Sequence, residues 1–455
     1  MSVLGTAAPT AAEFVEWYRR NRARSRALFD CLTSDAYYSQ PIALRHPIVF
    51  YEGHLPAFSF NTLIKRSLHR GSIAPRLETL FARGIDPHES VTQPGSRDSM
   101  TESERSALNA ARWPSRADVQ AFADEADRAV IEALTTADLD RPGDPLLDRA
   151  EAVFAILEHE AMHQETLLYI WHRLPFEQKV RPPRYDISAG LGEPRREWVD
   201  VPAGRATLGV DRGTIPFGWD NEFPATTAEV ARFAIERFDV TNGRFMEFVQ
   251  AGGYQDSRWW ASEDWEWVQH EQIQHPLFWE RHGDVWYWRA MFELVPLPAS
   301  WPVYVSHAEA SAFARWSGAR LPTEAEYQRA AYGSASRERP LPWGDAPPSV
   351  EHGVFDFSSW DPQPAGAHPK GASAWGVEDL VGNGWEWTST PFSPFPGFVA
   401  MASYPEYSAD FFDGEHYVMK GASPATAREL IRPTFRNWFR ARYPYPYATF
   451  RCVRD

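Results

Sequence analysis

The stretch HEAMHQETLLY, residues 159–169, lies within a segment from 145 to 174 that we expect to form one long helix. His159 and His163 are four residues apart, so they differ by about 40° around a helix and their imidazoles share one face. Two imidazoles at this spacing can bind one metal ion, although histidines of the core or the surface can have the same spacing. Glu165 lies about 240° from His159, so we expect it to orient a neighbour rather than bind the same ion.

Helical character extends outward from this segment over most of the first 175 residues. Four helices are predicted, at 13–32, 46–69, 115–136 and 145–174. Ser115 or Pro114 is placed to begin the third of them, and Asp118 suits its first turn. The polar stretch at 84–112 is expected to be a crossover loop or a partly ordered lid. Four helices with one long connection predict a four-helix bundle over residues 1–178.

The second part of the chain has a different composition. Residues 179–198 are rich in proline, glycine and charge, and we expect them to form a linker that wraps rather than a free tether. Short β-like runs follow, and two capping boxes predict helices that begin after Ser306 and Thr323. The predicted fold class is therefore α+β, with a helical bundle at 1–178 and a loop-rich mixed domain at 199–455.

The composition of all 455 residues excludes several classes of protein. Lys and Arg number 46 against 61 Asp and Glu, a net charge of −15 that argues against binding to nucleic acid or to an anionic membrane. No apolar run approaches the roughly 20 residues of a membrane span, and we see no secretory signal, so a cytoplasmic location is expected. Two cysteines, Cys31 and Cys452, are too few for a disulfide framework or a four-cysteine zinc site.

A third metal ligand is available in YEGHLPAF, residues 51–58. His54 lies in an otherwise apolar and aromatic segment, where an imidazole needs either a hydrogen bond or a metal ion. Three histidines from two facing helices could occupy one face of an octahedral site and leave positions for substrate and dioxygen. This arrangement suits Fe(II), although a three-histidine zinc site has the same ligands. HEAMH also fits the HExxH pattern of zinc proteases, but no third ligand follows at their usual spacing.

The motifs GHLPAF and HEAMHQETLLY resemble the DinB-like bundle of the ergothioneine-type sulfoxide synthases, which are non-heme iron enzymes. The second half resembles the formylglycine-generating-enzyme (sulfatase-modifying factor) fold. The matching stretches are FGWDNEFP (217–224), FDVTNGRFMEFV (238–249), PVYVSHAEASAFARWSGARLPTEAEYQRAA (302–331), LVGNGWEWTST (380–390) and FRNWFRARYPYPYATFRCV (435–453). The resemblance implies that Fe(II) binds to His54, His159 and His163. It also implies that O2 is used to join a chalcogen donor to C2 of the hercynine imidazole. The formylglycine-generating enzymes fit less well, because they need a redox cysteine pair in this domain.

The same resemblance suggests where the substrates bind. Asn437 and Trp438 fit the family's site for the betaine end of hercynine, and an aromatic face suits a quaternary ammonium. Phe439 and Trp385 are further possible walls, although Trp385 is expected mainly to belong to the core. Arg440 or Arg442 could pair with a substrate carboxylate. Met162, between the two helical histidines, is a further candidate for substrate contact.

The sequence departs from the sulfur-using members after WEWT. Phe392 and Phe395 stand where those enzymes carry tyrosines, and a phenylalanine has no O–H to donate. Another tyrosine could have taken over this role, for which the candidates are Tyr404, Tyr443, Tyr445 and Tyr447. Otherwise the chain resembles the selenoneine synthase branch, whose donor is a selenosugar.

Our leading prediction from these residues is therefore a selenoneine synthase that forms a C–Se bond with Fe(II) and O2. The first alternative is an ergothioneine-forming sulfoxide synthase that takes cysteine or γ-glutamylcysteine, with Arg97, Arg112 or Arg116 on the donor carboxylate. A zinc-dependent DinB-type thiol transferase and a non-enzymatic recognition scaffold are further alternatives.

Overall fold

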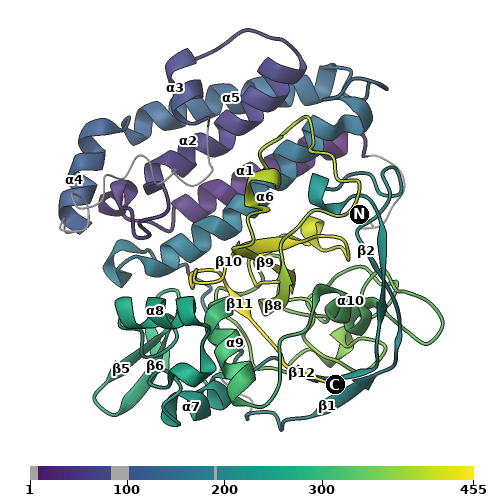
Figure 1. Cartoon of the computed structure of the whole chain (residues 1–455). Helices are drawn as coiled ribbons and strands as arrows, with labels where there is room; N and C mark the ends of the chain where they lie inside the picture. The colour runs from purple at the N-terminus through teal and green to yellow at the C-terminus, as the bar shows by residue number, and fades with distance from the viewer. Residues whose placement is uncertain (1–8, 83–101, 189–191) are drawn as a thin grey trace. The chain divides into compact units, whose positions relative to one another are not determined.

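The computed structural model describes residues 9–82, 102–188 and 192–455. These residues form two compact units, and the division falls between Arg184 and Tyr185. It therefore lies inside the stretch that we expected to be a linker. Tyr185, directly after the division, packs on the second unit: its hydroxyl donates to the Asp361 carboxylate at 2.9 Å. Figure 1 shows the helices and strands of both units.

The first unit is the predicted four-helix bundle. Its four long helices are α1 (Ala11–Phe29), α2 (Ile48–Ser59), α5 (Arg116–Thr136) and α6 (Glu151–Arg173). Helices α1 and α2 each pack against both α5 and α6 (Figure 1). Shorter elements join them: η1 (Ser34–Tyr38), η2 (Phe60–Ser67), α3 (Pro75–Leu80), α4 (Glu102–Arg112), η4 (Asp148–Ala150) and η5 (Phe176–Gln178). The side chain of Ser115 accepts from the backbone N–H of Asp118, as predicted for the cap of α5.

The structure refines two sequence expectations for the bundle. The helix expected at 46–69 is present, but it changes at Phe60 from the α-helix α2 to the π-helix η2. The polar stretch at 84–112 is not all loop. Its last part is helix α4, whose sequence ESERSALNAAR consists largely of good helix formers. Residues 84–101 of that stretch lie outside the described residues.

A buried polar network joins α1 to α5 and α6. The guanidinium of Arg22 donates to Asp127 at 2.8 Å and to Glu160 at 2.9 Å. The hydroxyl of Tyr18 donates to Asp127, and that of Ser25 donates to Glu160. Arg22 is thus turned into the bundle and paired there rather than solvated.

The second unit is the mixed domain predicted from the short β-like runs. Its sheets have the strand orders β1-β4-β12, β2-β3, β5-β6-β7 and β10-β9-β8-β11. The strands are β1 (Trp198–Val201), β2 (Gly204–Leu208), β3 (Thr226–Val230), β4 (Phe233–Glu236), β5 (Trp279–His282), β6 (Val285–Arg289), β7 (Leu294–Pro296), β8 (Gly384–Pro391), β9 (His416–Ala422), β10 (Asn437–Arg440), β11 (Ala448–Thr449) and β12 (Val453–Arg454). The helices are α7 (Asn242–Gln250), α8 (Ser262–His270), α9 (His307–Trp316) and α10 (Glu324–Tyr332), with short turns η6 (Asp220–Glu222), η7 (Ser257–Trp259), η8 (Pro369–Gly371), η9 (Ala409–Phe411) and η10 (Arg428–Leu430). Both predicted capping boxes are present, at the starts of α9 and α10.

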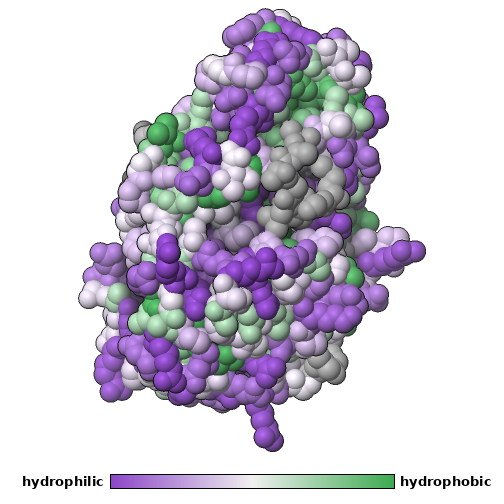
Figure 2. All heavy atoms as spheres, turned by 90° about the vertical axis from the view of Figure 1, so that its right-hand side faces the viewer, coloured by the Kyte–Doolittle hydropathy of each residue, from purple (hydrophilic) through white to green (hydrophobic). Residues whose placement is uncertain are grey.

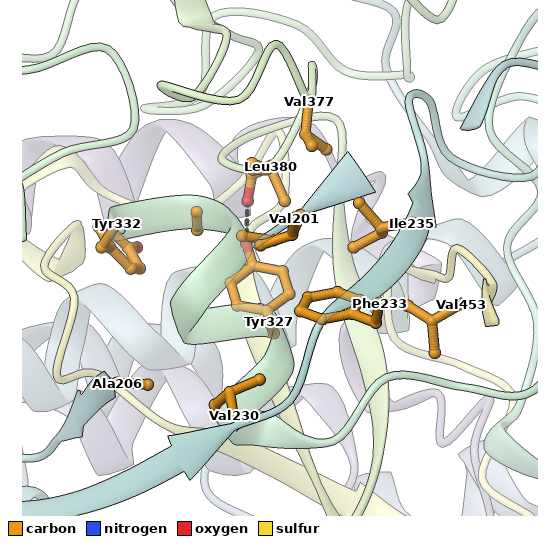
Figure 3. Close-up of a cluster of buried hydrophobic side chains, with 12 residues drawn as sticks. Val201, Ala206, Val230, Phe233, Ile235, Tyr327, Tyr332, Val377, Leu380 and Val453 are labelled. Carbon is orange, nitrogen blue, oxygen red and sulfur yellow. Dashed lines mark hydrogen bonds between the residues drawn. The ribbon is translucent and has the colours of Figure 1, made fainter. Parts of the chain in front are cut away.

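The core of this unit combines an apolar cluster with a buried ion-pair network. Figure 3 shows the cluster, in which the Tyr327 hydroxyl donates to the carbonyl of Leu380. Elsewhere in the unit, Arg451 is fully buried and donates to Glu386 at 2.6 and 2.9 Å and to Asp239 at 3.0 Å. A buried guanidinium needs such partners, so this network ties β8 to the C-terminal segment.

The described helices include none that is long and apolar enough to cross a membrane. Hydrophilic residues cover most of the face seen in Figure 2. Among the described residues, the exposed large hydrophobic side chains are Leu44, Val180, Val285, Val350 and Val399, and single exposed side chains of this kind are ordinary for a folded protein surface.

Candidate metal centre

Helices α2 and α6 bring His54, His159 and His163 together inside the bundle. One nitrogen from each ring can be chosen so that all three atoms lie within 4.8 Å of one another. The ring centroids are 5.1 Å apart for His54 and His159, 5.0 Å for His54 and His163, and 4.2 Å for His159 and His163. This cluster was expected from the four-residue spacing in one helix and the isolated histidine in the other.

Hydrogen bonds to backbone carbonyls orient two of the three rings. Nδ1 of His54 lies 2.8 Å from the carbonyl oxygen of Phe81, and Nδ1 of His163 lies 3.1 Å from that of His159. A ring that donates its Nδ1–H to a carbonyl keeps a lone pair on Nε2, the atom that can bind a metal. Nε2 of His54 is buried and has no hydrogen-bond partner among the described residues. A metal ion would satisfy this acceptor, so the donor set fits one.

The electrostatics of the cluster keep the imidazoles neutral. Burial lowers the pKa of His54 and of His159 well below the ordinary value, and the neighbouring imidazoles act in the same direction. Burial lowers the pKa of His163 to about 4, and the charge of Arg45 adds to this effect. Only a neutral imidazole has a free nitrogen lone pair, so the site is ready for a metal at neutral pH.

Aromatic side chains pack against the three histidines. Phe58 stacks on His159 with centroids 3.5 Å apart and planes 7° from parallel, and Phe50 stacks on His54 at 5.0 Å. Phe50, His54 and Phe58 are spaced four residues apart on α2, so they share one face of the helix. These packed rings fix the imidazole planes and exclude water from one side of the site. Sequence reasoning did not assign them, although their four-residue spacing was visible.

Two other residues of the motif are Glu160 and Met162. Glu160 faces α1, where its carboxylate accepts from Arg22 and from Ser25. The glutamate of the HExxH pattern is thus paired inside the bundle. Met162 is partly exposed and lies three residues after His159, about 60° away around the helix.

In the second unit, Trp438 belongs to an aromatic cluster. Phe392 stacks on it at 4.2 Å with planes 6° from parallel, Tyr407 meets it edge-on at 5.1 Å, and Phe411 lies at 5.7 Å. Tyr407 was not among the tyrosines that the sequence suggested. Only the fold brings it to the cluster, because it is 31 residues before Trp438 and lies in irregular chain.

The structure does not bring all the expected substrate residues together. Side chains alternate along β10, so Trp438 and Arg440 face one side of the sheet while Asn437 and Phe439 face the other. Consistent with this, Phe439 stacks on Tyr443 at 5.3 Å rather than on the cluster around Trp438. Trp385 is buried against Phe435 and belongs to the core, as expected.

Phe392 and Phe395 are both buried beside one guanidinium. Arg436 lies 5.1 Å from the ring centroid of Phe392 and 4.3 Å from that of Phe395. Its guanidinium donates two hydrogen bonds to Glu324, at 2.9 and 3.1 Å. These positions therefore hold apolar rings in a packed, charge-paired setting and offer no hydroxyl group.

Most of the arginines suggested for a substrate carboxylate already lie near protein carboxylates. Arg442 pairs with Glu263 at 2.7 Å and Asp264 at 3.2 Å, Arg440 lies 3.7 Å from Glu415, and Arg116 lies 3.2 Å from Glu52. Arg112 ends helix α4, and Arg97 lies outside the described residues.

In a comparison with known proteins, the two parts of the chain match two different families. Residues 18–167 match the DinB superfamily, and residues 189–455 match the family described as sulfatase-modifying factor enzyme 1-like domain. A hercynine oxygenase of Mycobacterium tuberculosis is 36% identical over 388 residues, which cover 84% of this chain and 88% of that protein. The chain belongs to the hercynine oxygenase family.

Other relatives agree with membership of the hercynine oxygenase family. Ergothioneine biosynthesis protein 1 of Schizosaccharomyces pombe is 28% identical over 93% of this chain and 54% of that protein. A formylglycine-generating enzyme of Mycobacterium tuberculosis is 29% identical but matches only 57% of this chain. The predicted family and α+β fold class are confirmed, and the chain is an enzyme, as predicted.

Proposed function

We propose that this enzyme uses O2 and a metal ion to join a sulfur donor to the imidazole of hercynine. The names of its relatives, hercynine oxygenase and ergothioneine biosynthesis protein 1, support hercynine as the substrate and favour sulfur over selenium. The observation that carries the metal dependence is the cluster of three neutral imidazoles, two of them buried, with Nε2 of His54 lacking another partner among the described residues.

The metal that suits three neutral histidines and dioxygen is Fe(II). His54, His159 and His163 would hold it, and the bound ion would supply the activation of dioxygen. The protein's own contribution is to keep the imidazoles neutral by burial and to orient them through the carbonyls of Phe81 and His159. The packed ring of Phe58 excludes water from one face of His159.

In the second unit we propose that the cluster around Trp438 binds the quaternary ammonium of hercynine. Such a group forms no ordinary hydrogen bond and is attracted by aromatic faces. Tyr407 contacts the same tryptophan as Phe392, and this supports its hydroxyl as the replacement for the one that Phe392 and Phe395 lack. Its Oη is our candidate proton source for the reaction.

A second candidate function is formation of a C–Se bond from a selenosugar, our leading prediction from the sequence. One observation favours it: both positions expected to hold a tyrosine carry buried phenylalanines. A selenolate is a stronger nucleophile than a thiolate, so it makes different demands on proton delivery. The selenium prediction and a cytoplasmic location stay predictions.

A competition assay distinguishes these functions. Fe(II)-loaded protein receives hercynine and O2 with cysteine, γ-glutamylcysteine and a selenosugar present together, and the products are identified by mass spectrometry. A sulfoxide adduct of hercynine is the expected result, whereas a selenium adduct would favour the second candidate.

Two controls make the assay specific for the metal centre. The His159→Ala variant should bind no Fe(II) and form no adduct, and full activity in it would refute the metal assignment. Protein loaded with Zn(II) should be inactive; turnover with Zn(II) and without O2 uptake would instead support the thiol transferase alternative.

A further inference from the structure

Gly53 occupies a buried position on α2, immediately before His54. The ring of Phe81 packs so closely on it that a Cβ at this position would lie 2.5 Å from Cε2 and Cζ of that ring. Two non-bonded carbon atoms do not approach this closely, so any residue larger than glycine at position 53 would displace the Phe81 ring. Glycine is unfavourable in a helix interior relative to alanine, and the close approach of Phe81 explains its presence here.

Phe81 also supplies the carbonyl that accepts the hydrogen bond from Nδ1 of His54, at 2.8 Å. Its ring is fully buried, and it packs at 6.0 Å from Trp113 and at 6.3 Å from Phe122. The ring and the carbonyl belong to one residue, so the depth to which the ring packs on Gly53 sets where the carbonyl lies.

Hydrogen bonds of Glu78 also hold the segment that precedes Phe81. Glu78, in helix α3, accepts backbone N–H groups from Ile73 and Ala74 at 2.8 Å each. Lys65, in η2, donates to the same carboxylate at 2.7 Å. Helix α3 is thus fastened to the end of the α2–η2 segment, and Phe81, the residue after α3, cannot move far without breaking these bonds.

We propose that Gly53 and Phe81 act together as a positioning pair for His54. The absence of a side chain at Gly53 lets the Phe81 ring pack fully against α2. The packed Phe81 then holds its carbonyl where it accepts the Nδ1–H of His54. This hydrogen bond fixes the His54 ring with Nε2 directed toward the other two histidines. This inference rests on the proposed metal site, but the ring orientation and tautomer that it predicts belong to the metal-free protein as well.

The test is the Gly53→Ala variant of the full chain. In metal-free protein, ¹⁵N NMR of the histidine side chains should show that His54 loses its single Nδ1–H tautomer. Affinity for Fe(II), measured anaerobically by competition with a chelator, should fall by about 10- to 100-fold, as for other supporting partners of metal ligands. Neither readout requires turnover, so a failed hercynine assay would leave this test intact.

A second substitution tests whether the clash is the cause. Phe81→Val keeps the carbonyl group but removes the ring that packs on Gly53, so by itself it should also weaken the Nδ1–H tautomer of His54 and lower the affinity for Fe(II). Both substitutions disrupt the same packing contact, so Gly53→Ala should cause little further loss when it is added to Phe81→Val. If Gly53→Ala alone does not fold, Phe81→Val carries the test: a wild-type tautomer and affinity in Phe81→Val would overturn the proposal.

Gly253 offers a matched control in the other unit, because a Cβ there would lie 2.2 Å from the ring of Phe248. Gly253→Ala should lower thermal stability without changing Fe(II) affinity or the His54 tautomer. The proposal is overturned if Gly53→Ala keeps the wild-type tautomer and affinity. It is equally overturned if Gly253→Ala lowers the affinity as much, since the effect would then be general destabilisation.

Discussion

Replacement of Glu160 by alanine separates a structural role of this residue from a catalytic one. Its carboxylate is fully buried and accepts from Arg22 at 2.9 Å and from Ser25 at 2.7 Å. Removal of one partner from a buried ion pair costs about 3–5 kcal/mol, because the other charge stays buried and loses its partner. Arg22 keeps Asp127, so we expect the lower end, about 3 kcal/mol of unfolding free energy for the helical unit.

Native-state hydrogen exchange is the suitable assay, because it reports the opening free energy of individual segments in a chain of two units. Amides of α1 and α6 in metal-free Glu160→Ala protein should exchange about 100-fold faster, which corresponds to about 3 kcal/mol. Arg26→Ala is the matched control: it removes ion pairs of a guanidinium that is 54% exposed, worth at most about 1 kcal/mol. Unchanged exchange together with complete loss of turnover would refute this reasoning and support a general-base role for Glu160.

Three further predictions concern the sites themselves. Trp438→Ala should weaken hercynine binding at least tenfold by calorimetry while Fe(II) content stays the same; unchanged hercynine affinity would argue against the cation site. Tyr407→Phe should slow adduct formation with little change in hercynine affinity, and a wild-type rate would exclude this hydroxyl as the proton source. The folded pKa of His163, about 4, lies below the ordinary value of about 6.5, so the unfolded chain binds more protons between these values. Metal-free protein should therefore lose up to about 3 kcal/mol of unfolding free energy from this group as pH falls from 6.5 to 4. An unfolding free energy from urea titrations that stays constant over this pH range would contradict the lowered pKa of His163.

Features that depend on neighbours in the chain could be predicted from the sequence. The caps of α9 and α10 were predicted from residues three apart, since a capping bond closes within one helical turn. The shared face of His159 and His163 follows from helix geometry alone. The same local rules identified the helical first part of the chain and the mixed second part.

The sequence prediction of the substrate site was incomplete, because it could not show which face of a strand a side chain occupies or which distant residues contact it. Trp438 and Phe439 are adjacent in sequence, and only their place on β10 shows that they face opposite sides of a sheet. The course of an irregular segment brings Tyr407 to Trp438, and no periodic pattern encodes such a course. HEAMH fits the HExxH pattern, but only the fold shows that α1 places Arg22 against Glu160.

The sequence by itself therefore determined the helical bundle, the mixed second domain and the three histidines that could share one ion. Those properties follow from helix periodicity and from the cost of burying an imidazole without a partner. Only the tertiary structure decided which carbonyl orients His54, which aromatic rings pack against the three histidines and which carboxylates form ion pairs with arginines. Such contacts join residues far apart in the chain, such as His54 and Phe81, and depend on packing depths that local patterns do not encode.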